Sequence, residues 1–301
     1  SYVDIFCMDK TGTLTANKLN LTEILPIDGD EAHVRKLVGD GIASMTNLNK
    51  TAEAIAAVCP GTAGRVIDEV PFSSDRKWSA ISFEAGASGG TFAMGAPEML
   101  RPLLQGGDDL PAPEGWADQG LRILLVAHAD EVGSLHGDDD VPALPNTMTP
   151  LAWLGFSDEL RPNSQQTLQQ FRDAGITLKI ISGDNPDTVA ALARQAGFKG
   201  NLVEISGVEL AGMSESDFRQ AAIEGTIFGR ITPEQKERLI KALRDQGHYV
   251  AMTGDGVNDV LSLKQANLGI AMQSGSQATR GAADIVLLHD TFEALPLAFR
   301  E

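Results

Sequence analysis

The chain has 301 residues, of which 43% are hydrophobic and 22% charged, a composition that suits one large or two ordinary folded domains and excludes extensive disorder. Its formal net charge of −17 argues against nucleic acid as a partner, because binding a phosphate backbone requires a basic face. No apolar run reaches about 18 residues, so the sequence predicts no membrane span. Two cysteines, Cys7 and Cys59, cannot form a disulfide framework and are expected to be buried thiols in a reducing, cytoplasmic setting.

The N-terminal segment places a carboxylate at the end of a strand. Residues 2–8 are mostly apolar and predict a short buried strand, which Asp9 follows directly. Ligands of open parallel sheets bind beyond the carboxyl ends of the strands. In the stretch 9–15 (Asp-Lys-Thr-Gly-Thr-Leu-Thr), Gly12 lets the backbone approach closely, and N–H groups of a tight turn can bind an anion. The stretch therefore indicates a phosphoryl site, although turn chemistry alone explains an isolated Asp-Lys-Thr.

The next segment changes from this pattern to a β-rich one that includes two helices near its start. Within it we expect a strand leaving the first domain at 20–27, helices at 31–47, 50–58 and 97–104, strands at 66–71, 78–84, 91–94 and 121–129, and a Gly-rich hairpin turn at 86–90. The acidic triplet 138–140 predicts a solvated loop rather than a metal site, because no His or Glu flanks it with ligand spacing.

From residue 151 the pattern alternates between strands and helices. The expected strands are 151–156, 177–181, 226–229, 249–252, 268–271 and 285–288, and the expected helices are 163–174, 186–196, 233–246 and 258–265. This alternation predicts a doubly wound parallel α/β sheet that also takes in the first strand, 2–8. Residues 1–21 and 149–301 therefore form one expected domain, and 22–148 form a domain inserted into it.

Several predicted strands end in groups that suit phosphoryl transfer, which requires charge neutralisation and in-line positioning. We assign Asp9 as the nucleophile. The expected ligands of Mg²⁺, which prefers oxygen, are Asp9, the backbone carbonyl of Thr11, Asp255 and Asp259. The remaining roles are support of the metal loop by Gly254 and Asn258, a hydrogen bond to a phosphoryl oxygen from Ser182, and positive charge from Lys10 and Lys236. Taken singly, the segments 182–185 and 254–256 are ordinary turns, and Lys236 is an ordinary helix-surface lysine.

The stretch 9–15 matches the phosphorylation motif of the P-type ATPases residue for residue, and the strand-end groups together resemble the haloacid dehalogenase-type phosphotransferases. The resemblance covers essentially the whole chain, including a hinge-like segment at 158–162. It implies that Asp9 attacks the γ-phosphate of ATP and becomes an aspartyl phosphate. Soluble phosphatases of that superfamily carry a second Asp two residues after the nucleophile. Thr11 stands there instead, so the phosphoenzyme is expected to persist.

The inserted segment resembles the nucleotide-binding domain of the same family. By this resemblance Phe72 stacks on adenine, and Arg76 and Lys77 lie beside the nucleotide. The other nucleotide-contacting residues that it implies are Gly95, Arg122, Glu53, Gly183 and Asp184. Met94 stands where the family usually has Lys, which removes one cation, although a thioether can still pack against the base. Phe72 remains open to interpretation as a core aromatic, and Arg122 and Glu53 as ordinary structural residues.

We therefore expect the nucleotide-binding and phosphorylation domains of a cation-transporting P-type ATPase, with ATP as substrate and Mg²⁺ as cofactor. The motifs at 72–77 and 95–98 and the segment 260–263 indicate a bacterial, calcium-pump-like branch. The chain starts eight residues before Asp9, and we expect it to be a fragment of a multi-pass protein of the cell membrane that faces the cytoplasm. The membrane helices and the actuator domain would lie elsewhere in the polypeptide, and the fragment alone would turn over slowly. The alternatives are a soluble phosphatase with a large cap domain and a non-enzymatic nucleotide sensor.

Overall fold

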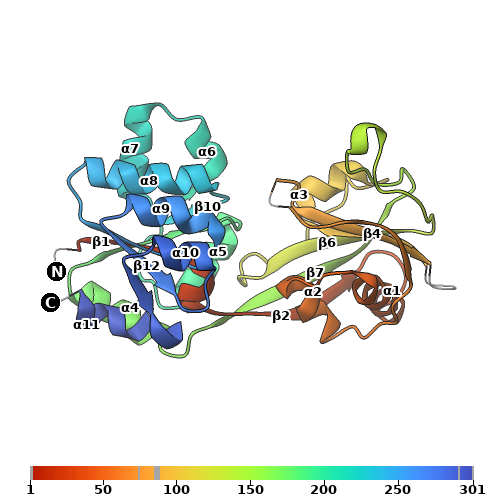
Figure 1. Cartoon of the computed structure of the whole chain (residues 1–301), viewed down its shortest axis with the longest axis horizontal. Helices are drawn as coiled ribbons and strands as arrows, with labels where there is room; N and C mark the ends of the chain where they lie inside the picture. Colours follow the sequence, from red (N-terminus) through yellow and green to blue (C-terminus); the bar gives the residue numbers. More distant parts are fainter. Residues whose placement is uncertain (1–2, 74, 85–88, 291, 300–301) are drawn as a thin grey trace. The chain divides into compact units, whose positions relative to one another are not determined.

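The computed structural model describes residues 3–73, 75–84, 89–290 and 292–299, which separate into two compact units (Figure 1). The first unit comprises residues 1–18, 117–120 and 158–301, and the second comprises 19–116 and 121–157. Two strands, β2 (Thr15–Pro26) and β7 (Thr149–Leu160), carry the chain from one unit to the other. Within the described part of the chain, no helix has both the length and the hydropathy of a membrane span.

The first unit is built on a parallel sheet that has seven strands among the described residues. Their order is β13 (Ile285–Leu287), β12 (Leu268–Met272), β11 (Val250–Gly254), β1 (Ile5–Asp9), β8 (Thr177–Ile181), β10 (Ile227–Gly229) and β9 (Glu204–Ser206). The helices of this unit are α4 (Ser164–Asp173), α5 (Pro186–Gln195), α6 (Gly207–Ala211), α7 (Glu215–Glu224), α8 (Pro233–Asp245), α9 (Val260–Gln265), α10 (Gln277–Ala282) and α11 (Leu295–Ala298). The predicted doubly wound α/β fold is confirmed.

Helices cover both faces of this sheet, and the central strand β1 supplies side chains to both cores. Phe6 and Met8 belong to the core shared with α4, α5 and α11, whereas Ile5 and Cys7 belong to the core shared with α7, α8 and α9. Successive side chains of a strand point to opposite faces, and a strand covered on both sides reads as a continuous apolar run. Asp9 is thus the polar end of a strand that is otherwise fully enclosed.

The second unit holds a sheet of six described strands in the order β2, β7, β6 (Arg122–Ala129), β5 (Gly90–Gly95), β4 (Trp78–Glu84) and β3 (Arg65–Val70). The strands from β7 to β3 pair antiparallel. Helices α1 (Glu31–Ser44) and α2 (Lys50–Ala56) share one core with this sheet. The short helix α3 (Pro97–Leu100) contributes Leu100 to a second core on the sheet.

The predicted strand 151–156 was assigned to the wrong sheet. It lies within β7, which pairs antiparallel with β6 in the second unit rather than joining the parallel sheet. The error has a physical cause, because residues Pro150 to Phe156 are all buried, and an unbroken apolar run is typical of a parallel strand. Sequence analysis also missed β9, α6, α7, α10 and α11, and the predicted turn 86–90 lies mostly outside the described residues.

Candidate active site

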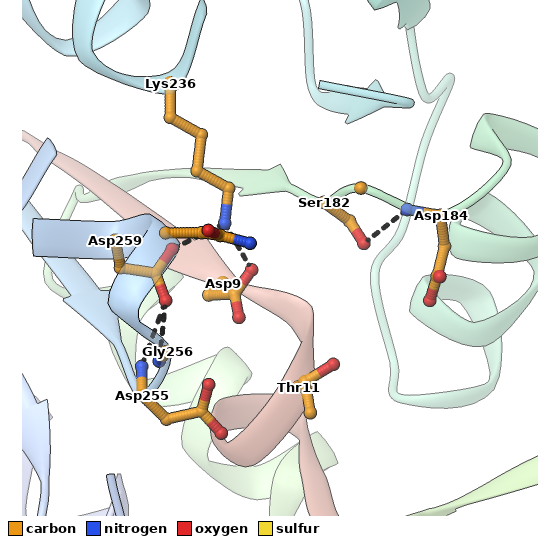
Figure 2. Close-up of a pocket in the computed structure, with 10 residues that line it drawn as sticks. Asp9, Thr11, Ser182, Asp184, Lys236, Asp255, Gly256 and Asp259 are labelled. Carbon is orange, nitrogen blue, oxygen red and sulfur yellow. Dashed lines mark hydrogen bonds and ion pairs between the residues drawn. The ribbon is translucent and has the colours of Figure 1, made fainter. Parts of the chain in front are cut away.

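The carboxyl ends of three neighbouring strands and the start of one helix meet at a single cavity of about 250 Å³ (Figure 2). Asp9 ends β1, Ser182 follows β8, and Asp255 follows β11. Because β8, β1 and β11 are adjacent and parallel, their carboxyl ends share one edge of the sheet. The cavity is lined by Asp9, Thr11, Ser182, Gly183, Asp184, Lys236, Asp255, Gly256, Asn258 and Asp259. All the residues predicted for phosphoryl transfer except Lys10 and Gly254 are in this lining.

Lys236 is buried beside the predicted nucleophile. Its Nζ donates to Asp9 Oδ1 at 2.8 Å and to Asp259 Oδ1 at 2.7 Å, as Figure 2 shows. Helix α8 holds it there, because Thr232 and Gln235 form a reciprocal capping box that fixes the first turn. Burial opposes the charged form, but the carboxylates of Asp9 and Asp259 outweigh this effect and raise the pKa of Lys236. The lysine is therefore a permanent cation, and its interpretation as a solvated surface residue is excluded.

Asp9 is a carboxyl group whose ionisation is tuned by burial. Burial raises the pKa of Asp9 to about 7, and the neighbouring carboxylates of Asp259 and Asp255 act in the same direction, whereas Lys236 lowers it. Among protein groups, pKa values shifted this far towards neutrality cluster at functional sites. The carboxylate that this arrangement presents at neutral pH is only weakly stabilised by its surroundings.

Two further carboxylates stand next to Asp9. Oxygen atoms of Asp9, Asp255 and Asp259 lie within 4.8 Å of one another. Asp259 Oδ2 accepts the backbone N–H groups of Asp255 at 3.2 Å and of Gly256 at 3.0 Å, so it holds the loop that carries Asp255. Its other oxygen is engaged by Lys236, and this arrangement suits a positioning residue better than a direct metal ligand. Gly254 is required here, since a Cβ on it would lie 2.4 Å from Cβ of Asp259.

The turn after Asp9 brings its backbone close to the same carboxylates. Gly12 has φ of +75°, and a Cβ on it would lie 2.6 Å from Asp255 Oδ2. The carbonyl of Gly12 accepts a hydrogen bond of 2.6 Å from the guanidinium of Arg161. Within the turn, the hydroxyl group of Thr13 lies 3.0 Å from that of Thr253, a contact that ties the turn to β11. The close approach of turn and loop depends on the glycine that the motif places at this position.

Lys10 does not face the cavity as a phosphate ligand would. It is buried and paired with Asp158, and its Nζ lies 2.7 Å from Asp184 Oδ2. Burial opposes its charge, but these two carboxylates more than compensate and raise the pKa of Lys10. Sequence analysis missed the role of Asp158, which it placed only in a hinge-like segment. No local signal in the sequence links the two residues, because Asp158 follows Lys10 by 148 positions.

The loop after β8 is held by its own backbone. Ser182 Oγ accepts the N–H of Asp184 at 3.1 Å, and the carbonyl of Asp184 accepts the N–H of Arg230. Gly183 is exposed at the rim of the cavity, while Asp184 lines it and pairs with Lys10. These contacts fix the Ser182 hydroxyl at the cavity wall.

The residues predicted to bind the nucleotide base belong to the second unit. Phe72 is 47% exposed, which excludes its interpretation as a core aromatic. The guanidinium of Arg76 stacks on Trp78, 5.2 Å from the ring centroid. Gly95 of β5 pairs with Trp78 of β4. The backbones approach so closely here that a Cβ on Gly95 would lie 2.8 Å from the carbonyl of Lys77. The motif 72–77 and Gly95 therefore meet at one end of this hairpin.

The other predicted residues are more dispersed. Glu53 is exposed on α2, Arg122 begins β6 and is half-buried, and Gly183 and Asp184 belong to the first unit. Met94 is 4% exposed and packs in the core that the sheet shares with α1 and α2. The expectation that its thioether remains available to pack against a base is thus wrong, because the side chain is used in the core.

Comparisons with known proteins agree with this geometry. The chain matches the family model of haloacid dehalogenase-like hydrolases over residues 3–267. It is 38% identical over 298 residues to a probable cation-transporting ATPase, exp7, of Streptococcus pneumoniae, and 37% identical over 299 residues to the calcium-transporting ATPase CtpE of Mycobacterium bovis. It is also 31% identical to calcium-transporting ATPase 1 of Bacillus cereus. Each match covers at least 98% of this chain, which spans only 36–38% of the length of these three relatives.

Proposed function

The chain belongs to the haloacid dehalogenase-like hydrolases, and we propose that it is the catalytic part of a cation-transporting P-type ATPase whose phosphorylated residue is Asp9. Similarity over nearly the whole of this chain to proteins named as cation- and calcium-transporting ATPases confirms the family resemblance carried by the stretch 9–15. The observation that carries the proposed chemistry is the buried contact of Lys236 with both Asp9 and Asp259, beside Asp255.

In the proposed reaction an oxygen of Asp9 attacks the γ-phosphorus of ATP. A bond forms between the carboxylate oxygen and phosphorus, the bond from phosphorus to the β–γ bridging oxygen breaks, and ADP leaves with that oxygen. Lys236 favours the ionised form of the nucleophile and offsets charge on the transferring group, while the Ser182 hydroxyl can donate to a phosphoryl oxygen. The transfer needs no proton donor on the enzyme, because ADP is a good leaving group.

The residues around Asp9 fit a magnesium ion. Asp9, Asp255 and the backbone carbonyl of Thr11 would supply hard oxygen ligands at the cavity, and Asp259 would orient Asp255 through its loop. When bound, Mg²⁺ neutralises negative charge as phosphate approaches the carboxylate. Gly12, which leaves room for Asp255 Oδ2, is part of the same arrangement.

Thr11 supports a durable phosphoenzyme rather than a rapid phosphatase. It lines the cavity two residues after Asp9, where a second carboxylate would act as general acid and base in water attack. A threonine cannot take up the proton of an attacking water at neutral pH. A long-lived aspartyl phosphate is what coupling to a conformational change requires.

The complete protein, we propose, uses this cycle to move a cation across the cell membrane, with this part on the cytoplasmic side. The named relatives make calcium a reasonable candidate. ATP would be bound through the second unit, with Phe72, Arg76, Lys77 and Gly95 at the base and with Glu53 and Arg122 as further contacts. The ion-binding helices and an actuator domain would belong to other parts of the polypeptide.

Acyl-phosphate labelling tests the proposal. The 301-residue chain is incubated with Mg²⁺ and radiolabelled ATP or acetyl phosphate, and acid-precipitated protein is treated with hydroxylamine, which cleaves acyl phosphates. We expect label that is lost in Asp9→Asn and strongly reduced in Asp255→Asn. Label that persists in Asp9→Asn would refute the nucleophile assignment. Steady hydrolysis of a simple phosphate ester without accumulating label would favour a soluble phosphatase, and absence of both would favour a nucleotide sensor.

A further inference from the structure

The loop that carries Asp255 is held from a second side by a segment that sequence analysis did not single out. This segment, called here the clamp, comprises residues 273–280 between β12 and the end of the first turn of α10. The N–H of Ser276 donates to the carbonyl of Asp255 at 2.8 Å, and Thr279 Oγ1 donates to the carbonyl of Gly256 at 2.8 Å. Two successive carbonyls of the loop that carries Asp255, called here the metal loop (residues 254–259), therefore accept hydrogen bonds from the clamp.

The hydroxyl of Thr279 bonds outside its own helix. Thr279 lies in the first turn of α10, where the helix offers it no carbonyl four residues earlier. The carbonyl of Gly275, which precedes the N-cap Ser276, accepts from Arg280, and Arg280 also donates to the carbonyl of Gln273 at 3.0 Å. Thr279 is fully buried, and its hydroxyl is directed across to Gly256.

The hydroxyl of Thr279 is itself oriented by Ser276. Ser276 Oγ accepts the N–H of Thr279 at 3.1 Å and lies 2.5 Å from Thr279 Oγ1. A hydroxyl has one proton to donate, and that of Thr279 goes to Gly256, so the Ser276 hydroxyl is the donor in the contact between the two side chains. The result is a directed chain of hydrogen bonds from Ser276 through Thr279 to the metal loop.

Two other features keep the clamp in place. A Cβ on Gly275 would lie 2.9 Å from the carbonyl of Asp255, so this close backbone approach requires glycine. At the other end, the N–H of Ser274 donates to Asp290 at 3.1 Å, and the N–H of His289 donates to the side-chain oxygen of Gln273 at 2.7 Å. The clamp is thus anchored by residues outside the cavity lining, and it contacts carbonyls of the loop, whereas Asp259 contacts its N–H groups.

We propose that Thr279 is a positioning residue for Asp255, acting through the carbonyl of Gly256. The metal role of Asp255 rests on the proposed function, whereas the restraint on the loop does not. Asp259 holds the loop by its N–H groups and Thr279 holds it by a carbonyl, so the backbone on both sides of the Asp255 side chain is fixed. Loss of the Thr279 hydroxyl leaves Asp255 in the sequence but lets its carboxylate move.

The test compares Thr279→Val, which removes the hydroxyl while keeping the shape, with Thr279→Ser, which keeps the hydroxyl. Thr167→Val is the matched control, because Thr167 is also buried in the first unit and its hydroxyl bonds to the carbonyl of Asn163, the N-cap of α4, at 3.0 Å. Amide hydrogen exchange of residues 254–260 is measured in the metal-free 301-residue chain, and binding of Mn²⁺ alone is measured by electron paramagnetic resonance.

A lost hydrogen bond typically changes an equilibrium by about three- to tenfold. We expect Thr279→Val to raise both the exchange rate of 254–260 and the Mn²⁺ dissociation constant by factors of that order, and Thr279→Ser and Thr167→Val to match the wild type. Should Thr279→Val not fold, Thr279→Ala, which also removes the hydroxyl, replaces it and gives the same pattern. Wild-type behaviour of Thr279→Val, equal impairment of Thr279→Ser, or the same changes in Thr167→Val would each overturn the proposal. A wild-type chain that binds no Mn²⁺ would count against the proposed metal site, and the exchange rates would still decide the role of Thr279.

Discussion

Replacing the proposed nucleophile should make the chain more stable. The pKa of Asp9 rises from 3.8 to about 7 on folding, chiefly because the carboxyl is buried. At about 1.4 kcal/mol per pKa unit, ionised Asp9 lowers the unfolding free energy by about 4 kcal/mol at pH 8. Asparagine has nearly the same shape, carries no charge and can still accept a hydrogen bond from Lys236. We therefore expect Asp9→Asn to be more stable than the wild type by an amount approaching this figure.

The effect has a defined dependence on pH. Because the folded-state pKa exceeds that of the unfolded chain, the folded wild type binds more protons between about pH 4 and pH 7, and its stability falls as the pH rises through that window. The cost is fully present above pH 7 and absent below about pH 4. The advantage of Asp9→Asn should accordingly be largest at pH 8 and shrink as the pH approaches 4.

Urea denaturation of the metal-free chain at a series of pH values from 5 to 8, in the presence of EDTA, measures this difference. Asp109→Asn, at an exposed carboxylate of the second unit, is the control and should show no such trend. If Asp9→Asn is equal to or less stable than the wild type at pH 8, burial does not destabilise the Asp9 carboxylate and the explanation given for its pKa is wrong.

Three further substitutions follow from the contacts of the site. Lys236→Met should abolish labelling and cost about 3–5 kcal/mol in urea denaturation at pH 8, because it leaves buried carboxylates without their cation; wild-type stability would contradict the burial argument. Gly12→Ala should lower the free energy of unfolding by about 1–2 kcal/mol from its positive φ alone. It should also weaken Mn²⁺ binding, because the added Cβ would clash with the Asp255 carboxylate. Unchanged Mn²⁺ affinity would show that the backbone of the turn moves to relieve this clash. Phe72→Ala should weaken ATP binding by about tenfold in calorimetric titration while leaving the melting temperature unchanged, since the ring is exposed. Phe72→Trp, which keeps an aromatic ring, should bind ATP as the wild type does. If Phe72→Ala binds ATP as tightly as the wild type, Phe72 does not stack on the base.

The meeting of Asp9, Ser182 and Asp255 was predictable because each follows an apolar strand, and parallel strands bring their carboxyl ends to one edge. The partners of Lys10 were not predictable in this way. Asp158 follows Lys10 by 148 positions, and it reaches the lysine only because β7 returns the chain from the second unit. The local sequence pattern does not indicate which strand β7 pairs with or which residues it brings to Lys10. The strand 151–156 was placed in the wrong sheet for the same reason.

The role of Thr279 illustrates a second limit. Its neighbours, Ser276 and Arg280, are ordinary helix-start residues, and no spacing in the sequence indicates that the hydroxyl turns away from its own helix. The direction becomes evident only from the hydrogen bond that Thr279 donates to the carbonyl of Gly256. Contacts made by backbone carbonyls leave no pattern in side-chain chemistry, so residues that position a site are harder to predict than residues that line it.

The charges of the cavity indicate an order for the proposed reaction. Three carboxylates cluster here, Lys236 contacts two of them, and Lys10 is already paired with Asp158 and Asp184. A triphosphate that approached this edge of the sheet alone would bring further negative charge to these carboxylates in a buried setting, where repulsion is weakly screened. A divalent cation held by Asp255 would reduce that repulsion, and it would also lower the cost of ionised Asp9. Metal binding should therefore precede or accompany productive approach of the γ-phosphate, so that labelling depends on Mg²⁺ even at saturating ATP.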